Sequence, residues 1–236
     1  MSETELYCGT SGFSFKEWKG PFYPEKLPAN EMLGYYAERL PTVEINNTFY
    51  RMPKRSMLEG WAAKVPQTFR FAVKAPRRIT HSKQLRDCGD EAGYLFGALE
   101  ALGPRLGIVL FQLPPHARVD VDKLDAFLSL VPAGTAAAFE FRHPSWQDNS
   151  VYDALGKHRA TWVHADNDGG EPPEFPHTAS TAYLRLRAED YPDTVLAAWK
   201  KRCAEFDRAF VFFKHEDGGR GPGYAKRMLD ADGDAV

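Results

Sequence analysis

The chain has 236 residues, of which 43% are hydrophobic, 13% aromatic and 26% charged. This composition supports an ordinary apolar core and excludes a disordered chain. A formal net charge of −2 excludes a strong overall attraction to nucleic acid or to membranes, so any anion binding must be local. The three cysteines are far apart and odd in number, and no apolar run approaches the ~20 residues that span a bilayer. We therefore expect a cytoplasmic protein with reduced thiols.

Short β-branched or aromatic runs alternate along the chain with longer segments of helical periodicity. Strands are predicted at residues 6–10, 42–46, 69–75, 106–113, 136–142, 160–166, 182–187 and 209–214. Helices are predicted at residues 30–39, 54–63, 85–102, 121–130, 150–157, 194–206 and 224–229. Residues 169–179 are rich in proline and are expected to form an irregular connection.

The spacing of these strands indicates the fold. Strand starts recur at roughly 22–37 residues, close to the ~30 residues of a βαβ unit. We therefore predict an α/β fold, a TIM-like (β/α)8 barrel that forms a single domain over residues 1–236. A doubly wound open sheet is the alternative, because alternation alone does not show closure. However, no glycine-rich phosphate fingerprint follows the first strand.

Polar side chains collect near the C-terminal ends of the predicted strands. Side chains alternate across a strand, so residues two apart, such as Glu140 and Arg142, share a face. In a β/α barrel that face points into the mouth where the chemistry of this fold takes place. The residues expected there are Glu44, Asn46, Lys74, Gln112, Glu140, Arg142, His164, Asp166, Arg185, Arg187 and Lys214. An ion-pair network that fixes strand register is the structural alternative.

Two further segments are basic or rich in glycine. Residues 214–223 read KHEDGGRGPG and lead into the last helix, an arrangement that often binds phosphate in β/α barrels. A flexible glycine loop is the alternative. Residues 74–86 follow the third strand and carry Lys74, His81 and several further basic side chains. Such a run is usually a solvated face, but on this rim it gives a positive mouth suited to a phosphorylated or nucleic-acid substrate.

Other chemistries have weaker support. Oxygen and nitrogen donors for Mg²⁺, Mn²⁺ or Zn²⁺ could come from Glu44, Glu140, His164, Asp166 and His215, but no ligand spacing singles them out, so no metal residue or cofactor is assigned. The GTSG sequence at residues 9–12 is not the GxSxG elbow of a serine hydrolase.

Aromatic residues at positions 13–23 are expected to form a hydrophobic plug, with a stacking platform for a ring as the alternative. Tyr50 is better placed than these residues to contact a ligand.

Five stretches of the chain carry a family resemblance: GTSGFSFKEWKGPFYP, VEINNTFYRMP, FRFAVKAPRRITH, LGIVLFQLPP and AFEFRHPSW. They resemble, in that order, the YecE-like family, also called domain of unknown function 72. The resemblance implies a TIM-like barrel with a polar cavity at the strand C-termini, without an established activity. It marks as motif positions Glu44, Asn46, Tyr50, Lys74, His81, Gln112, Glu140, Arg142 and Trp146. The last third departs from the family pattern at RLRA, residues 185–188, and at FKHE, residues 213–216.

The leading hypothesis is a hydrolase-like or lyase-like enzyme acting on an anionic, phosphate-bearing substrate. Glu44 or Glu140 would act as general base or metal ligand, Lys74 would tune it, and two arginines would clamp the anion. The residues expected to bind substrate are Asn46, Tyr50, His81, Gln112, Arg142, Trp146, Asp166, Arg185 and Lys214. A non-catalytic module that binds a metabolite or a nucleic-acid end, and a metal-dependent nuclease, are the alternatives. The sequence leaves open whether the protein is an enzyme, its cofactor and its oligomeric state.

Overall fold

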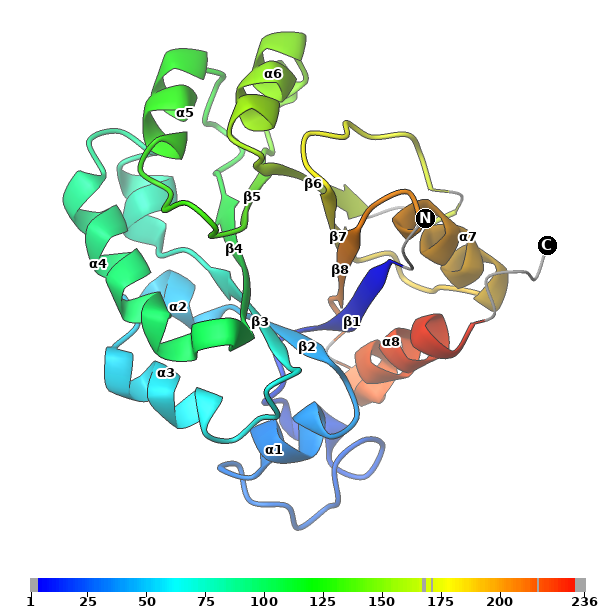
Figure 1. The fold of residues 1–236 in the computed structure, drawn as a ribbon. Helices are drawn as coiled ribbons and strands as arrows, with labels where there is room; N and C mark the ends of the chain where they lie inside the picture. Colours follow the sequence, from blue (N-terminus) through cyan, green and yellow to red (C-terminus); the bar gives the residue numbers. More distant parts are fainter. Residues whose placement is uncertain (1–3, 167–168, 171, 216, 232–236) are drawn as a thin grey trace.

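Eight parallel strands pair in chain order and close into a barrel (Figure 1). The computed structural model describes residues 4–166, 169–170, 172–215 and 217–231. The strands are β1 (Glu5–Ser11), β2 (Thr42–Ile45), β3 (Arg70–Lys74), β4 (Leu106–Gln112), β5 (Ala137–Glu140), β6 (Thr161–Asp166), β7 (Thr181–Leu186) and β8 (Arg208–Phe213). All eight predicted strands are confirmed, and so is the barrel; the open-sheet alternative is wrong.

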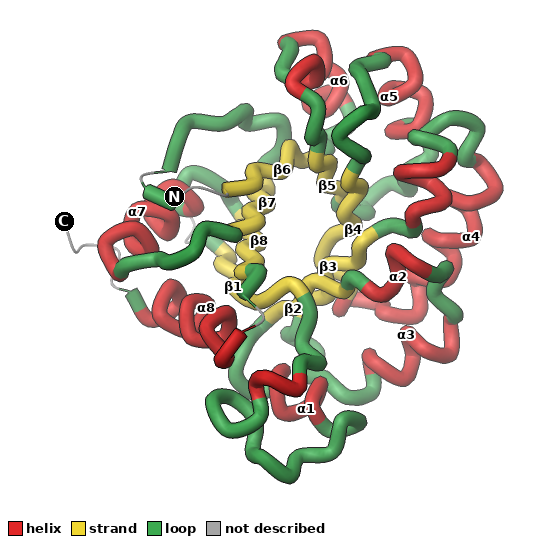
Figure 2. The backbone as a smooth tube through the Cα atoms, turned by 180° about the vertical axis from the view of Figure 1, so that it is seen from behind, coloured by secondary structure: helices red, strands yellow, loops and turns green. Residues whose placement is uncertain are grey.

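Helices surround the barrel, as Figure 2 shows from behind. They are α1 (Met32–Ala37), α2 (Asn47–Tyr50), α3 (Arg55–Ala62), α4 (Gly89–Leu99), α5 (Val121–Leu128), α6 (Asn149–Lys157), α7 (Asp193–Cys203) and α8 (Arg220–Asp230). The short α2 was not predicted, and α8 begins four residues before its predicted start. No helix forms in the described residues between β6 and β7, as expected of that proline-rich connection. None of the described helices has the length and apolar character needed to cross a bilayer.

Aromatic and aliphatic side chains fill the interior of the barrel along most of its length. The residues of this apolar layer are Ala72, Ile108, Leu110, Ala138, Val163, Tyr183, Phe210 and Phe212. Tyr183 packs on Phe212 with ring centroids 5.2 Å apart. Along several strands the next inward-facing residue toward the C-terminal end is polar, because side chains two apart share a face. The barrel interior is thus a packed apolar layer beneath a polar one.

Glycine permits close approach where the barrel wall is tight. At Gly9 in β1, a Cβ atom would lie 2.0 Å from the carbonyl oxygen of Thr42 in β2, a distance no real side chain tolerates. At Gly107 in β4, a Cβ atom would lie 2.9 Å from the ring of Phe210. A side chain at either position would displace the neighbouring strand or the aromatic ring that fills the interior.

Candidate functional site

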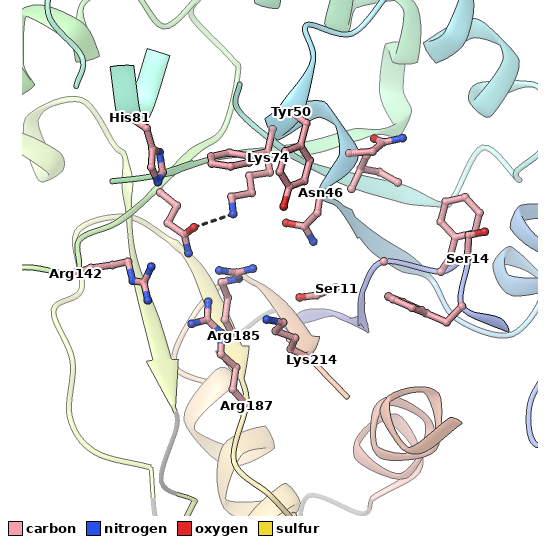
Figure 3. Close-up of a pocket in the computed structure, with 17 residues that line it drawn as sticks. Ser11, Ser14, Asn46, Tyr50, Lys74, His81, Arg142, Arg185, Arg187 and Lys214 are labelled. Atoms are coloured by element: carbon pink, nitrogen blue, oxygen red, sulfur yellow. Dashed lines mark hydrogen bonds between the residues drawn. The ribbon is translucent and has the colours of Figure 1, made fainter. Parts of the chain in front are cut away.

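A cavity of about 600 Å³ opens at the C-terminal ends of the strands (Figure 3). Its wall includes residues 11–15 at the end of β1 and in the β1–α1 connection, and residues 45–50 around α2. Further side chains come from positions at or just beyond the ends of β3, β4, β5, β7 and β8. Five of the lining side chains are cationic: Lys74, Arg142, Arg185, Arg187 and Lys214. In Figure 3 their nitrogen atoms border a common open space.

Glu44 of β2 is fully buried beneath this cavity. Its Oε1 accepts hydrogen bonds from Ser11 Oγ at 2.8 Å, Asn46 Nδ2 at 2.9 Å and Arg185 Nη2 at 2.7 Å. Its Oε2 accepts one from the hydroxyl of Tyr183 at 2.7 Å. Burial alone would raise the pKa of Glu44, but Arg185 and the hydrogen bonds outweigh it and lower the pKa to about 2. Glu44 is therefore an ionised carboxylate whose lone pairs are already engaged.

Glu140 at the end of β5 occupies a similar environment. Its Oε2 accepts hydrogen bonds from Gln112 Nε2 at 2.8 Å and Arg185 Nη1 at 2.7 Å. Arg187 Nη2 lies 3.3 Å from Oε1. Burial opposes ionisation, but Arg185 and Arg187 hold the pKa of Glu140 below its ordinary value. This carboxylate, too, is committed to cationic partners.

Arg185 joins the two carboxylates across the barrel. Its two terminal nitrogens bond to Glu44 and Glu140 separately, and its side chain is only 4% exposed. Burial would lower the pKa of Arg185, but the two carboxylates raise it. Its Nε is buried without a hydrogen-bond acceptor among the described residues, and the same holds for Nε of Arg187. The arginine therefore ties β2, β5 and β7 together at the floor of the cavity.

Lys74 ends β3 and lies apart from these ion pairs. Its Nζ donates a hydrogen bond to Oε1 of Gln112 at 2.7 Å, drawn as a dashed line in Figure 3. The same nitrogen lies 4.4 Å from the ring centroid of Phe49 in α2. Burial lowers the pKa of Lys74 to about 8, Arg185 adds to the effect, and the two glutamates partly oppose it. A substantial fraction of this amine is therefore unprotonated in mildly alkaline solution.

His81 lines the cavity next to this lysine. It belongs to the short π-helical turn Arg78–Ser82 that follows β3. Its ring meets Phe49 edge to face at 4.8 Å, and its Nδ1 shares a hydrogen bond with Oγ1 of Thr80 at 2.9 Å. Burial lowers the pKa of His81, and the charge of Lys74 adds to the shift. Both effects favour the neutral imidazole of His81.

Residues 7–235 match the family described as "Protein of unknown function DUF72". The chain belongs to this family. UPF0759 protein YunF of Bacillus subtilis (strain 168) is 25% identical over 95% of this chain and 94% of that protein. UPF0759 protein YecE of Escherichia coli (strain K12) is 32% identical over 47% of this chain and 41% of that protein. A crystal structure of a DUF72 family protein from Thermotoga maritima superposes with a TM-score of 0.79 at 28% identity, covering 96% of this chain and 98% of that chain. The expected family resemblance is confirmed.

Most of the predicted site residues of this DUF72 protein lie together. Those that line the cavity are Asn46, Tyr50, Lys74, His81, Gln112, Arg142, Arg185 and Lys214. Glu44 and Glu140 lie beneath it and reach it through Arg185. The shared strand face predicted for polar residues two apart is confirmed for Arg185 and Arg187, because both contact Glu140.

Two of the residues expected to bind substrate lie elsewhere, and so does His164, which was expected at the mouth but shares the outer face of β6 with Asp166. Trp146 is fully buried, donates from Nε1 to the carbonyl of Ala117 at 2.8 Å, and stacks on Phe141 with centroids 4.3 Å apart. Asp166 ends β6 and accepts a hydrogen bond from the hydroxyl of Tyr191 at 2.6 Å. Because Val163 of β6 belongs to the interior apolar layer, Asp166 falls on the opposite face of that strand. Neither residue is in the cavity wall.

Three lining residues form the outer rim rather than the floor. Arg142 and Lys214 are exposed, and the side chain of Tyr50 is 77% exposed. β5 ends at Glu140, two residues before Arg142, and Glu140 pairs with Arg185 of β7 and with Arg187 just beyond that strand. Among the described residues, the cations paired with Glu140 are therefore Arg185 and Arg187, and Arg142 borders the cavity from the rim.

The donors considered for a metal do not converge. In the described ranges, no three or more His, Cys, Asp or Glu side chains form a group that could hold a metal ion. Glu44 and Glu140 are engaged by Arg185, whereas His164 packs against Phe175 and Trp199, with ring centroids 5.1 and 5.4 Å apart.

The glycine-rich segment after β8 packs against another loop. A Cβ atom at Gly219, which precedes α8, would lie 3.1 Å from Cβ of Pro21 in the β1–α1 connection. Of the described residues in this segment, Lys214 is the one in the cavity wall. Residue 216 lies outside the described residues. The predicted phosphate loop thus contributes a lysine to the cavity, while the start of α8 supports the β1–α1 connection.

Some residues of the site were not among those expected to act in catalysis or to bind substrate. Arg187, which was expected at the mouth from its i+2 spacing to Arg185, lines the cavity. Phe49 is in the wall beneath Lys74, and Tyr183 bonds to Glu44. Phe13 and Phe15 also line the cavity, whereas other aromatic residues of that segment, Trp18 and Tyr23, are buried in the core as a plug. The buried Trp18 and Tyr23 agree with the predicted plug, and the stacking platform for a ring stays a prediction.

Proposed function

We propose that this cavity binds an anionic, phosphate-bearing small molecule and that the protein catalyses a hydrolase-like or lyase-like reaction on it. The supporting observation is the imbalance of charge at the barrel mouth. Five cationic side chains line the cavity, whereas the two carboxylates that approach it, Glu44 and Glu140, are buried and bonded to Arg185. An enclosed excess of positive charge favours a ligand of opposite sign.

In this proposal, residues at the rim and residues at the floor of the cavity have different parts in binding the anion. Arg142 and Lys214 are exposed, and neither forms an ion pair with another described residue, so both can move to meet an anion. Arg187 offers a buried Nε that has no acceptor within the described part of the chain. Guanidinium groups suit phosphate because their planar forks donate two hydrogen bonds at once. Arg185, by contrast, is held by its glutamates and supplies a fixed positive charge at the floor.

The pKa values of the site groups favour Lys74 over the two glutamates for the proposed proton chemistry. A carboxylate with a pKa of about 2, such as Glu44, is a weak base. Lys74 has a pKa of about 8, faces the cavity and can act as an acid or a base near neutral pH. Glu44 and Glu140 are therefore proposed as positioning residues that hold Arg185 in place. Glu140 also positions Lys74 through Gln112. The role of catalytic base predicted for them passes to the lysine.

The proposal is tested by calorimetric titration of inorganic phosphate and pyrophosphate at several salt concentrations. We expect saturable binding that weakens as salt rises, and at least a tenfold loss of affinity in Arg142→Ala. Arg39→Ala is the matched control, because Arg39 lies near α1 and pairs with Glu38 on the surface. If neither anion binds, or if both variants bind equally well, anion recognition by this cavity is refuted.

A catalytic role needs a second measurement. A panel of phosphorylated metabolites is incubated with the wild type and with Lys74→Met, and products are followed by mass spectrometry. Turnover in the wild type that is lost in Lys74→Met supports an enzyme. Saturable binding without any product supports the non-catalytic binding module instead.

A further inference from the structure

Lys74 lies near two buried carboxylates, yet neither of them pairs with it. Among the described residues, the ion pairs of Glu44 and Glu140 are made by Arg185 and Arg187. The hydrogen bond that Lys74 donates goes to an uncharged acceptor, Oε1 of Gln112. A lysine in such a place is held in position without the counter-ion that would keep it protonated.

Gln112 produces this arrangement by separating the lysine from Glu140. Its Nε2 donates to Glu140 at 2.8 Å, and its Oε1 accepts from Lys74 at 2.7 Å. The amide is therefore fixed in one orientation, with its carbonyl toward the lysine. A neutral amine can still donate one N–H to that carbonyl and keep its lone pair free. The contact thus orients Nζ without consuming its nucleophilic electrons.

The remaining surroundings of Nζ act in two directions. The ring face of Phe49, 4.4 Å from Nζ, attracts the ammonium form, whereas burial and the neighbouring charge of Arg185 favour the neutral amine. Lysines become nucleophiles in proteins when they are desolvated or placed next to another cation. The lowered pKa of Lys74, about 8, agrees with this geometry.

We propose that Lys74 is a nucleophile that forms an imine with the carbonyl carbon of a phosphate-bearing aldehyde or ketone. This inference rests on the proposed function, because the cationic wall is what would hold the phosphate while the carbonyl meets Nζ. It narrows the substrate class from phosphate-bearing anions to those that also carry a carbonyl group. It also favours a lyase-type reaction, because an iminium group accepts the electron pair released when a neighbouring bond breaks.

The chemical step is balanced without an added oxidant or reductant. Nζ attacks the carbonyl carbon, and the carbonyl oxygen becomes the hydroxyl of a carbinolamine as the nitrogen loses a proton. That hydroxyl takes up a proton and leaves as water, while the nitrogen lone pair forms the C=N bond. His81 lines the same cavity and packs on the same ring, Phe49, so it is placed to pass protons between solvent and the carbinolamine.

The test uses pyridoxal 5′-phosphate as a probe, because it joins an aldehyde to a phosphate group. The full-length protein is incubated with the probe and reduced with borohydride, which converts an imine into a stable amine, and the modified lysine is located by peptide mass spectrometry. We expect the label on Lys74 in the wild type and no label at position 74 in Lys74→Arg. Lys64→Arg is the matched control, because Lys64 is an exposed lysine remote from the cavity wall, and it should be labelled as the wild type is.

The pH dependence of labelling gives a measurement that does not depend on any variant folding. The rate should rise with a midpoint near pH 8, the pKa of Lys74. At pH 8 its unprotonated fraction is roughly 100-fold that of an ordinary exposed lysine. A label confined to Lys214, labels spread evenly over surface lysines, or a midpoint near that of a free lysine would each overturn the inference.

Failure of this inference can be told apart from failure of the proposed function. If inorganic phosphate binds and Arg142→Ala weakens it, but no reducible adduct forms on Lys74, the imine is refuted and anion binding stands. If pyridoxal without its phosphate labels Lys74 as fast as the phosphorylated probe, the lysine is reactive but the cavity does not recognise phosphate. That result upholds the nucleophile and refutes the phosphate requirement.

Discussion

The interior of this barrel contains two layers that are equally buried and chemically opposite. In the apolar layer, Phe210 and Phe212 are 0% exposed; in the polar layer above it, Glu44 is 0% and Arg185 4% exposed. The apolar layer gains free energy by leaving water. The polar layer loses several kcal/mol per buried ion and recovers it only through well-formed pairs. Burial alone therefore does not account for the polar layer, which is stabilised by the ion pairs of Arg185 with Glu44 and Glu140.

Both layers are built from the same strands. In β7 the inward positions run from Tyr183 to Arg185 and continue beyond the strand to Arg187, and in β4 they run from Leu110 to Gln112. The inward-facing side chains thus change from apolar to polar within two residues. Substitutions in the apolar layer and in the polar layer should therefore affect stability through different interactions.

The largest effect is expected from Arg185→Met. This change leaves two buried carboxylates without their shared cation, which costs about 3–5 kcal/mol of the free energy of unfolding. Denaturant unfolding at pH 7 measures the loss. The triple variant Arg185→Met, Glu44→Gln, Glu140→Gln removes the charges together and should recover most of the stability. A single variant as stable as the triple variant would contradict the assignment of Arg185 as the counter-ion of both glutamates.

In the apolar layer, Leu110→Ala should cost about 2–5 kcal/mol, because it removes buried methyl groups and leaves a cavity. Leu110 is fully buried two residues before Gln112. The same unfolding experiment, repeated across salt concentrations and pH, separates the layers. The Leu110→Ala loss should stay constant, whereas the Arg185→Met loss should shrink in acid as the glutamates become protonated. An equal response of both variants to pH would refute the division.

Acid should weaken the polar layer in a defined pH range. The pKa of Glu44 is lowered to about 2 in the folded protein and is about 4.3 in an unfolded chain. Its contribution is therefore fully present above about pH 5 and is lost as the pH falls toward 2, amounting to roughly 2–3 kcal/mol. Unfolding curves at pH 7, 5 and 3 measure this. Glu44→Gln should show a smaller loss between pH 5 and 3, and parallel losses would be evidence against the pKa shift.

The smallest effect on stability is expected at the rim. Lys214→Ala should change the free energy of unfolding by no more than about 0.5 kcal/mol, because its side chain is exposed. The same variant should bind phosphate more weakly and with a shallower dependence on salt. Thermal unfolding and calorimetric titration check the two halves of this prediction. A large loss of stability would mean that the rim belongs to the structural network.

The architecture could be predicted from the sequence because its signals are local. Runs such as LGIVLFQ, which forms β4, are apolar on both faces, as strands of a closed parallel barrel must be. The short α2 was missed because four residues carry too little periodicity to detect. The early start of α8 at Arg220 was missed because glycine and proline there read as a loop.

The candidate site could be predicted only in part because its contacts are long-range. Strand alternation placed Lys74, Gln112 and Arg185 in the mouth, but nothing local shows that Arg185 reaches Glu44, 141 residues earlier in the chain. The prediction for Asp166 failed because the alternation of side chains along β6 was assigned to the wrong face. Val163, and not His164, faces the barrel interior. Trp146 is the last residue of the AFEFRHPSW stretch that resembles the family. Its indole Nε1 nevertheless donates a hydrogen bond to the carbonyl oxygen of Ala117 in the core.

The pairing of β1 with β8 has a consequence for how the chain folds. It joins Glu5 to Arg208 and Thr10 to Phe213, so the ends of the sequence meet only when some 200 residues between them have been arranged. Closing so long a loop is entropically costly and makes folding slow. Glu44 can pair with Arg185 only after β7 has been synthesised, and we expect its carboxylate to stay hydrated until then. The edge of β1 that pairs with β8 also stays open until β8 has been synthesised. We therefore expect the ion pairs of Arg185 with Glu44 and Glu140 to form in the last step of folding, after the final strands have joined the barrel.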